Sequence, residues 1–129
     1  MPSKNVISIV DDDASVRAAM KGLMKSLGFD AEAFDSAESF LQSNRRNSTS
    51  CLIADVHMPG MTGLELHDRL ASSDKPIPTI LITAYLDDQI WARALRTGVR
   101  CLLAKPFADE ELLGCIYGAL NSGDGSRKR

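Results

Sequence analysis

Residues 6–13, VISIVDDD, indicate the fold class, because a short apolar run is followed at once by three acidic residues. Such a run is typical of a strand that is covered on both faces in a parallel sheet. Apolar residues then recur at steps of three and four through residues 16–27, which predicts a helix that ends before Gly28. The chain therefore opens with a strand, an acidic loop and a helix.

The same alternation of strand and helix continues along the chain. Further strands are expected over residues 31–34, 51–54, 79–83 and 101–104. Short turns and amphipathic helices separate them, and residues 44–50 are expected to be a polar loop. Five strands alternating with five helices predict an α/β fold. It is a three-layer sandwich in which helices cover both faces of a five-stranded parallel sheet.

Composition and charge indicate one domain with no general affinity for nucleic acid. A chain of 129 residues, 44% of them hydrophobic, can bury a core of its own. Its formal net charge is −2, so we expect no direct contact with nucleic acid. No apolar segment approaches the roughly 20 residues of a membrane span, and none resembles a secretory signal. We therefore expect a cytoplasmic protein that does not contact a membrane.

The three cysteines, Cys51, Cys101 and Cys115, are odd in number and far apart in the sequence. No two of them have the spacing of a zinc knuckle, and no disulfide framework is indicated. We expect all three to be small buried hydrophobic residues.

Polar side chains follow four of the five expected strands, at the points where those strands end. Asp11 and Asp12 follow the first strand, Asp55 follows the third, Thr83 ends the fourth and Lys105 follows the fifth. The carboxyl ends of parallel strands share one edge of the sheet, where open α/β sheets bind their ligands. We therefore expect three acids, one hydroxyl and one amine to meet in one site.

Neighbouring carboxylates need a positive partner, since two of them about 4 Å apart repel by ~1 kcal/mol in water and ~4 kcal/mol at an effective dielectric of about 20. Oxygen ligands with room for water suit Mg²⁺, and Asp12 and Asp55 are the expected direct ligands. A carboxylate can also attack phosphorus and form an acyl phosphate. Mg²⁺, the Lys105 ammonium and the Thr83 hydroxyl are suited to stabilise a transferring phosphoryl group.

Four motifs in this order resemble the receiver domain of bacterial two-component response regulators, in particular the FixJ-like receivers. They are VDDD at 10–13, DVHMPGMTG at 55–63, Thr83-Ala84 and Lys105-Pro106-Phe107. The resemblance covers about residues 6–120. It implies a flavodoxin-like sheet with strand order 2-1-3-4-5. It also implies a signalling switch rather than an enzyme, which takes a phosphoryl group from a sensor histidine kinase.

The resemblance assigns a role to each acidic residue of the expected site. It implies that Asp55 is the phosphoacceptor and a metal ligand. Asp12 would bind the metal directly, and Asp11 would reach it mainly through water. The backbone carbonyl of His57 would complete the protein's share of the Mg²⁺ shell.

Two further side chains, Thr83 and Lys105, would hold the phosphoryl oxygens. Pro106 matches a proline whose preceding peptide bond is typically cis, which would aim Lys105 into the site. Phosphorylation would draw Thr83 inward and change the face built by the fourth helix, fifth strand and fifth helix, through which family members often form homodimers. Leu102 stands where the family carries its switch aromatic, which leaves open how Thr83 is coupled to that face.

The resemblance also bears on the domain organisation. We expect residues 1–122 to form the receiver and residues 123–129 to be a flexible tail or linker stub. FixJ-like regulators carry a helix-turn-helix domain after the receiver. The expected output is therefore transcription, controlled through a DNA-binding domain that is absent from this chain. Either the protein stands alone or the chain is part of a longer regulator.

Other acidic residues and two glycines have simpler expected roles. Acidic side chains are expected to cap three helices, namely Asp13 the first, Asp35 with Glu38 the second, and Asp109 the last. Gly114 and Gly118 lie within the last expected helix and would mark either close packing or an interface.

The histidine and aromatic side chains are also expected to be structural. The ring of His57 is expected to be exposed on a loop, since no second His or Cys stands at ligand spacing. His67 is expected to be an ordinary histidine on a helix surface. Tyr85 and Trp91 are expected to pack against the rest of the domain.

Two other classes of protein stay open at this point. Residues 9–16 loosely fit the nucleophile motif of haloacid-dehalogenase phosphatases, in which Asp11 would attack and Asp13 would act as acid and base. That interpretation needs a later acidic pair, which Asp124 alone does not supply, and it gives Asp55 no function. The other alternative is a receiver-like interaction module that is not phosphorylated. The complete set of acids, threonine and lysine argues against it.

Overall fold

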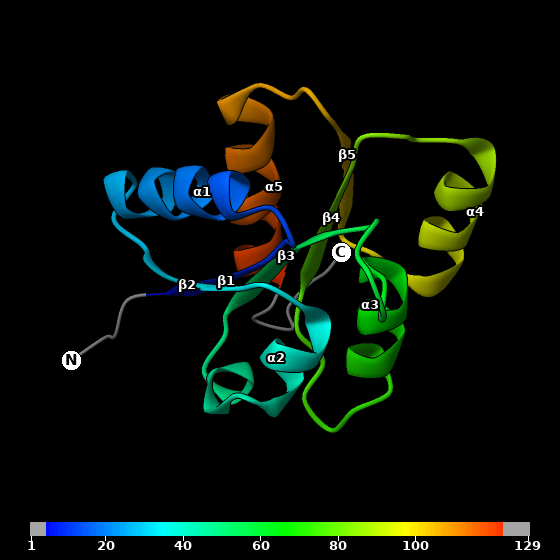
Figure 1. Cartoon of the computed structure of the whole chain (residues 1–129), viewed down its shortest axis with the longest axis horizontal. Helices are drawn as coiled ribbons and strands as arrows, with labels where there is room; N and C mark the ends of the chain where they lie inside the picture. Colours follow the sequence, from blue (N-terminus) through cyan, green and yellow to red (C-terminus); the bar gives the residue numbers. More distant parts are fainter. Residues whose placement is uncertain (1–4, 123–129) are drawn as a thin grey trace.

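A computed structural model describes residues 5–122, in which five strands alternate with five α-helices (Figure 1). The elements are β1 (Val6–Val10), α1 (Ala14–Ser26), β2 (Asp30–Phe34), α2 (Ala37–Gln42), a 3₁₀ helix (Asn44–Asn47), β3 (Cys51–Asp55), α3 (Gly63–Ala71), β4 (Thr79–Thr83), α4 (Asp88–Thr97), β5 (Cys101–Ala104) and α5 (Asp109–Ser122). The 3₁₀ helix replaces part of the expected polar loop. The expected tail at 123–129 lies outside the described residues.

The five strands form one parallel sheet in the order β2-β1-β3-β4-β5, as the resemblance implied. Ile9 of β1 is in register with Ile53 of β3, and Ile53 is in register with Ile80 of β4. β3 and β4 are buried along their whole length, since each has a strand on both sides and helices over both faces. This order brings the carboxyl ends of β1, β3, β4 and β5 side by side along one edge.

Two apolar cores separate the sheet from its helices. Figure 1 shows α1 and α5 on one side of the sheet and α2, α3 and α4 on the other. Met24 of α1 and Ile116 of α5 lie in the first core, and Phe40 of α2 and Leu66 of α3 lie in the second. This arrangement is the expected three-layer sandwich. Among residues 5–122, no helix has the length and apolar content that a membrane crossing requires.

Polar side chains fix the starts of α1 and α2. Asp13 caps α1, as predicted, because its carboxylate accepts hydrogen bonds from backbone N–H groups in the first turn. The predicted cap of α2 is wrong, since the Ser36 hydroxyl accepts the hydrogen bond from the Ser39 N–H. The Asp35 carboxylate instead accepts a hydrogen bond from the Ser39 hydroxyl at 3.1 Å.

The start of α5 also differs from the prediction. Asp109 is the first helical residue rather than the cap. The Glu111 carboxylate reaches back and accepts a hydrogen bond from the Ala108 N–H at 2.9 Å. A Cβ atom placed on Gly114 or Gly118 would meet no atom within 4 Å. These glycines therefore do not mark close packing inside the described part of the chain.

The expectation for the cysteines is correct for Cys51 and wrong for the other two. Cys51 is free and buried in β3. Cys101 of β5 and Cys115 of α5 form a disulfide. Because the chain reverses direction between β5 and α5, residues 14 apart in the sequence have Cα atoms only 6.0 Å apart.

Three side chains differ from the expected burial, and one agrees with it. His67 is 5% exposed rather than on the helix surface, because it shares the buried side of α3 with Leu64 and Leu70. Tyr85 is 75% exposed and Trp91 is 48% exposed, so neither is packed as expected. The His57 side chain is exposed on the loop after β3, as predicted.

Candidate functional site

Four strands bring the expected polar groups to one edge of the sheet. Asp11 directly follows β1, Asp55 and Thr83 are the last residues of β3 and β4, and Lys105 directly follows β5. Their strands are neighbours in the sheet, although Asp11 and Lys105 stand at opposite ends of the sequence. The structure therefore places these groups at the edge where the sequence predicts them.

Asp11, Asp12 and Asp55 form an acidic cluster. Each offers a carboxylate oxygen, and these oxygens all lie within 4.8 Å of one another. Asp11 and Asp55 are buried, whereas Asp12 is exposed. Oxygen donors at this spacing, with one side open to solvent, fit a hydrated divalent cation such as Mg²⁺. The acidic cluster can therefore hold a metal ion.

Lys105 supplies the positive charge that faces the acidic cluster. Its Nζ lies 3.9 Å from the Asp11 Oδ2 and 3.8 Å from the Asp55 Oδ2. The peptide bond between Lys105 and Pro106 is cis, as the resemblance implied. The amine thus lies between the two buried carboxylates.

Burial governs the ionisation of both buried acids. It raises the pKa of the Asp11 carboxyl above its ordinary value of 3.8, and the hydrogen bond from the Asp13 N–H partly offsets this effect. Burial also raises the pKa of the Asp55 carboxyl, and the Lys105 ammonium and then the His57 N–H partly lower it. Ionisation of these buried carboxyls therefore costs folding free energy, and a bound cation would reduce that cost.

Thr83, at the end of β4, and His57, on the loop after β3, border the acidic cluster. The Thr83 hydroxyl is buried and accepts a hydrogen bond from the Tyr85 N–H at 3.0 Å. The His57 N–H donates to the Asp55 Oδ1 at 3.3 Å, while its ring lies edge-on to Tyr85 with ring centres 6.1 Å apart. Within residues 5–122, no hydrogen bond joins the Thr83 side chain to the acidic cluster. The structure therefore holds Thr83 next to the cluster but bonded to its own loop.

Three residues for which the sequence predicts no role near the site lie against its loops and hold them in place. The Arg17 guanidinium donates to the backbone carbonyl of Asp11 at 2.8 Å. The Glu38 carboxylate accepts from the Met61 N–H at 3.1 Å and ties α2 to the loop after β3. A Cβ atom on Gly63 would collide with the Asp55 carbonyl oxygen, so only glycine allows this approach. The glycine could have been found from its place in the motif at 55–63, whereas Arg17 and Glu38 carry no such signal.

Leu102 lies in β5 in register with Leu81 of β4. It is partly buried and packs against the core on the side of α2, α3 and α4. The position at which the resemblance implies a switch aromatic is thus filled by an aliphatic side chain facing the α4 side of the sheet.

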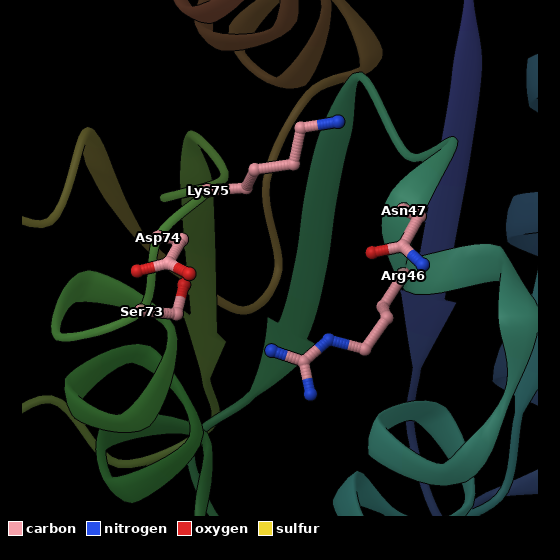
Figure 2. Close-up of a pocket in the computed structure, with 5 residues that line it drawn as sticks. All are labelled: Arg46, Asn47, Ser73, Asp74 and Lys75. Carbon is pink, nitrogen blue, oxygen red and sulfur yellow. The ribbon is translucent and has the colours of Figure 1, made fainter.

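A separate open hollow lies at the opposite edge of the sheet. It is lined by Arg46, Asn47, Ser73, Asp74 and Lys75 (Figure 2). These residues precede β3 and β4, so the hollow lies at the amino ends of those strands. It combines two cations with one carboxylate and contains none of the residues predicted for the site.

Comparison with known proteins identifies the family. The model of the response regulator receiver domain matches residues 7–117. The response regulator protein TodT of Pseudomonas putida is 40% identical over 116 residues, which are 90% of this chain and 51% of TodT. The transcriptional regulatory protein FixJ of Bradyrhizobium diazoefficiens is 34% identical over 128 residues, which are 99% of this chain and 62% of FixJ.

A solved structure described as FixJ-N agrees in fold. It has a TM-score of 0.82 and 28% identity, and the match covers 99% of this chain and all of the FixJ-N chain (100%). The chain belongs to the family of response regulator receiver domains. These are in general signalling domains rather than classical enzymes. The chain spans about half to two-thirds of the length of these two relatives.

The geometry also argues against the phosphatase alternative. Asp13, its required acid and base, caps α1 and is not part of the acidic cluster. Asp55, which that alternative leaves without a function, is a member of the cluster. Both observations agree with the receiver assignment.

Proposed function

We propose that this receiver accepts a phosphoryl group on Asp55 from a sensor histidine kinase and acts as the phosphorylation switch of a two-component system. The observation that supports this most directly is the position of the Asp55 carboxylate, which lies close both to two other acids and to the Lys105 amine. In the transfer, an Asp55 carboxylate oxygen bonds to phosphorus as the bond from phosphorus to the kinase histidine nitrogen breaks. The imidazole leaves as the neutral ring once it has taken up a proton.

The acidic cluster fits Mg²⁺. In this proposal Asp12 and Asp55 bind the ion directly, Asp11 binds it mainly through water, and the His57 backbone carbonyl completes the protein's ligands. A bound Mg²⁺ would neutralise charge on the phosphoryl oxygens. The spacing of the three carboxylates and the cost of burying two of them support the presence of a cation here.

Lys105 and Thr83 would hold the phosphoryl group once it is on Asp55. The Lys105 ammonium is already within 4 Å of the Asp55 carboxylate and could pair with a phosphoryl oxygen after a small movement. The Thr83 hydroxyl would exchange the Tyr85 N–H for a phosphoryl oxygen. This exchange would shift the loop that leads from β4 into α4.

The proposed output surface is the α4-β5-α5 face. Tyr85 and Leu86, just before α4, and Trp91 and Leu95, within it, are large exposed apolar side chains, which supports a contact surface there. We propose that phosphorylation promotes a homodimer through this face. The whole protein would then control transcription through a DNA-binding domain outside this chain, in the cytoplasm. Residues 1–122 would be the receiver, and residues 123–129 a tail or linker stub.

Intact-mass measurement after incubation with acetyl phosphate and Mg²⁺ tests the phosphoacceptor. We expect the unaltered chain to gain one phosphoryl group, and Asp55→Asn to gain none while keeping its circular dichroism spectrum. Asp35→Asn, which changes an exposed aspartate outside the acidic cluster, is the matched control and is expected to be labelled normally. Equal labelling of Asp55→Asn, or labelling that persists in excess EDTA, would contradict the proposal.

Sedimentation velocity tests the switch. We expect phosphorylation to increase self-association of the unaltered chain. In Lys105→Ala the phosphoryl group is expected on Asp55 without that increase, because the contact that couples the group to the β5–α5 loop is lost. Undiminished self-association of phosphorylated Lys105→Ala would exclude this role for the lysine.

A further inference from the structure

The disulfide between Cys101 and Cys115 joins β5 to α5. Both residues pack against the core between the sheet and the α1 and α5 helices, and each is partly exposed. Their Cα atoms are 6.0 Å apart, a separation that a disulfide spans without backbone movement. The fold therefore holds two thiols in position to pair, at a place that oxidants and reductants can reach.

The third cysteine provides an internal contrast. Cys51 is fully buried in the central strand β3, and burial raises the pKa of its thiol to about 12. Since the thiolate is the reactive form, Cys51 is protected from thiol–disulfide exchange in the folded chain. Among the three cysteines, thiol–disulfide exchange in the folded chain is thus expected only at the pair in β5 and α5.

We infer that Cys101 and Cys115 are a reversible redox modification site, which cross-links β5 to α5 when oxidised and leaves α5 held by its core packing alone when reduced. The oxidant class is a low-molecular-weight disulfide. One cysteine thiolate attacks this disulfide and forms a mixed disulfide, releasing one thiol. The other thiolate then attacks the protein sulfur and releases the second thiol. Two protein thiols are oxidised and one disulfide is reduced to two thiols.

The position of the bond gives it a consequence for the domain. The segment that it closes, residues 101–115, contains the β5–α5 loop with Lys105. Closing this segment restricts the loop and holds α5 against the sheet. In a reducing compartment, disulfides in proteins are usually transient or redox-sensing, which favours a reversible role. The inference concerns thiol chemistry alone and does not depend on phosphorylation of Asp55.

Thiol counting after incubation of the native chain with oxidised or reduced glutathione tests the inference. We expect oxidised glutathione to remove two of the three thiols without leaving a glutathione adduct, and reduced glutathione to restore them. Peptide mapping after alkylation in denaturant should find Cys51 as the free thiol in the oxidised chain. Cys101→Ser and Cys115→Ser should each lose the ability to form the internal bond. Cys51→Ala is the matched control and should behave like the unaltered chain.

The melting temperature gives a second measurement that requires no variant of a buried residue. We expect reduction to lower it by about 10 °C, because the bond closes a segment of roughly 15 residues. A double variant with Cys101→Ser and Cys115→Ser should have the same melting temperature with and without reductant. Three thiols that stay free in oxidised glutathione would overturn the inference. A bond that excess reductant leaves intact in the folded chain, or equal melting of both forms, would also overturn it.

Discussion

Asp55 and Lys105 have opposite effects on the stability of the fold. The Asp55 carboxyl is buried and its pKa is raised, so the folded chain binds its proton more tightly than the unfolded chain does. Ionisation at neutral pH therefore weakens folding. The Lys105 ammonium, 3.8 Å away, offsets part of this cost.

Substitutions of these two residues should have opposite effects on stability in metal-free buffer. We expect Asp55→Asn to raise the free energy of unfolding by on the order of 1 kcal/mol, since it removes one of the mutually repelling charges. Lys105→Met should lower it by a similar amount. Urea denaturation in EDTA at neutral pH measures both. A destabilised Asp55→Asn would show that repulsion in the acidic cluster is not the dominant energy.

The burial of His67 predicts how the stability of the fold depends on pH. Burial lowers its pKa below the ordinary value of 6.5, and the neighbouring Asp68 carboxylate offsets only part of that shift. As the pH falls below 6.5, the unfolded chain takes up a proton that the folded chain does not yet bind. The free energy of unfolding therefore decreases as the pH decreases. We expect His67→Gln to show a smaller loss of stability than the unaltered chain between about pH 7.5 and about pH 5.5.

The control for this measurement is His57→Gln, which changes the only other histidine, on an exposed loop. Urea denaturation at several pH values gives the free energy of unfolding of each variant. The slope of this free energy against pH is compared, rather than its absolute value. Equal slopes in the His67→Gln variant and the unaltered chain would show that protonation of His67 does not weaken the fold.

The burial of single side chains was only partly predictable. His67 follows Leu64 by three residues and precedes Leu70 by three, so helical spacing alone could have placed it on the buried stripe. Trp91 is different, because α4 fully buries only Ala94 and leaves the Trp91 and Leu95 side chains exposed. Composition and spacing do not show how much of an apolar helix face the sheet will cover.

Among the elements, three glycines in helices show two different effects of adding a side chain. It improves helix propensity where space is open, and it causes a collision where two backbones meet. Gly114 and Gly118 are exposed in α5 with open space around them. We expect Gly114→Ala and Gly118→Ala each to raise the free energy of unfolding by about 0.5–1 kcal/mol, through helix propensity alone. Thermal and urea denaturation of the oxidised chain measure the gain.

Gly63 at the start of α3 provides the contrast. A side chain there would collide with the Asp55 backbone carbonyl, so the loop that carries the acid would have to shift. We expect Gly63→Ala to destabilise the fold and to slow labelling by acetyl phosphate. Stabilisation by Gly63→Ala would show that the approach of the two backbones is not tight.

Most elements could be predicted because their signals are local. Each apolar run became a strand, and each spacing of three and four became a helix with ends near the expected residues. The pairing of Cys101 with Cys115 could not be predicted, since it depends on where α5 returns over β5. The sequence does not separate Ser36, which caps α2, from Asp35 one residue earlier, because both are suitable capping residues.

At the scale of the whole molecule, the site depends on topology. Strand ends that are distant in the sequence become neighbours only in the order β2-β1-β3-β4-β5. The alternation of strands and helices predicted the parallel sheet and its shared edge, whereas the strand order itself came from the resemblance to known receivers. Arg17 and Glu38, which hold the loops around the site, could be recognised only from contacts in the folded chain.

In the proposed function, this edge of the sheet carries a phosphoacceptor, and Asp55 is that residue. Borohydride reduces an aspartyl phosphate to homoserine, so peptide mapping of the reduced chain identifies the residue that carried the phosphoryl group. After labelling with acetyl phosphate and Mg²⁺, we predict homoserine in place of Asp55 and nowhere else. Homoserine in place of Asp11, or no homoserine in a chain that has gained phosphate, would contradict the claim.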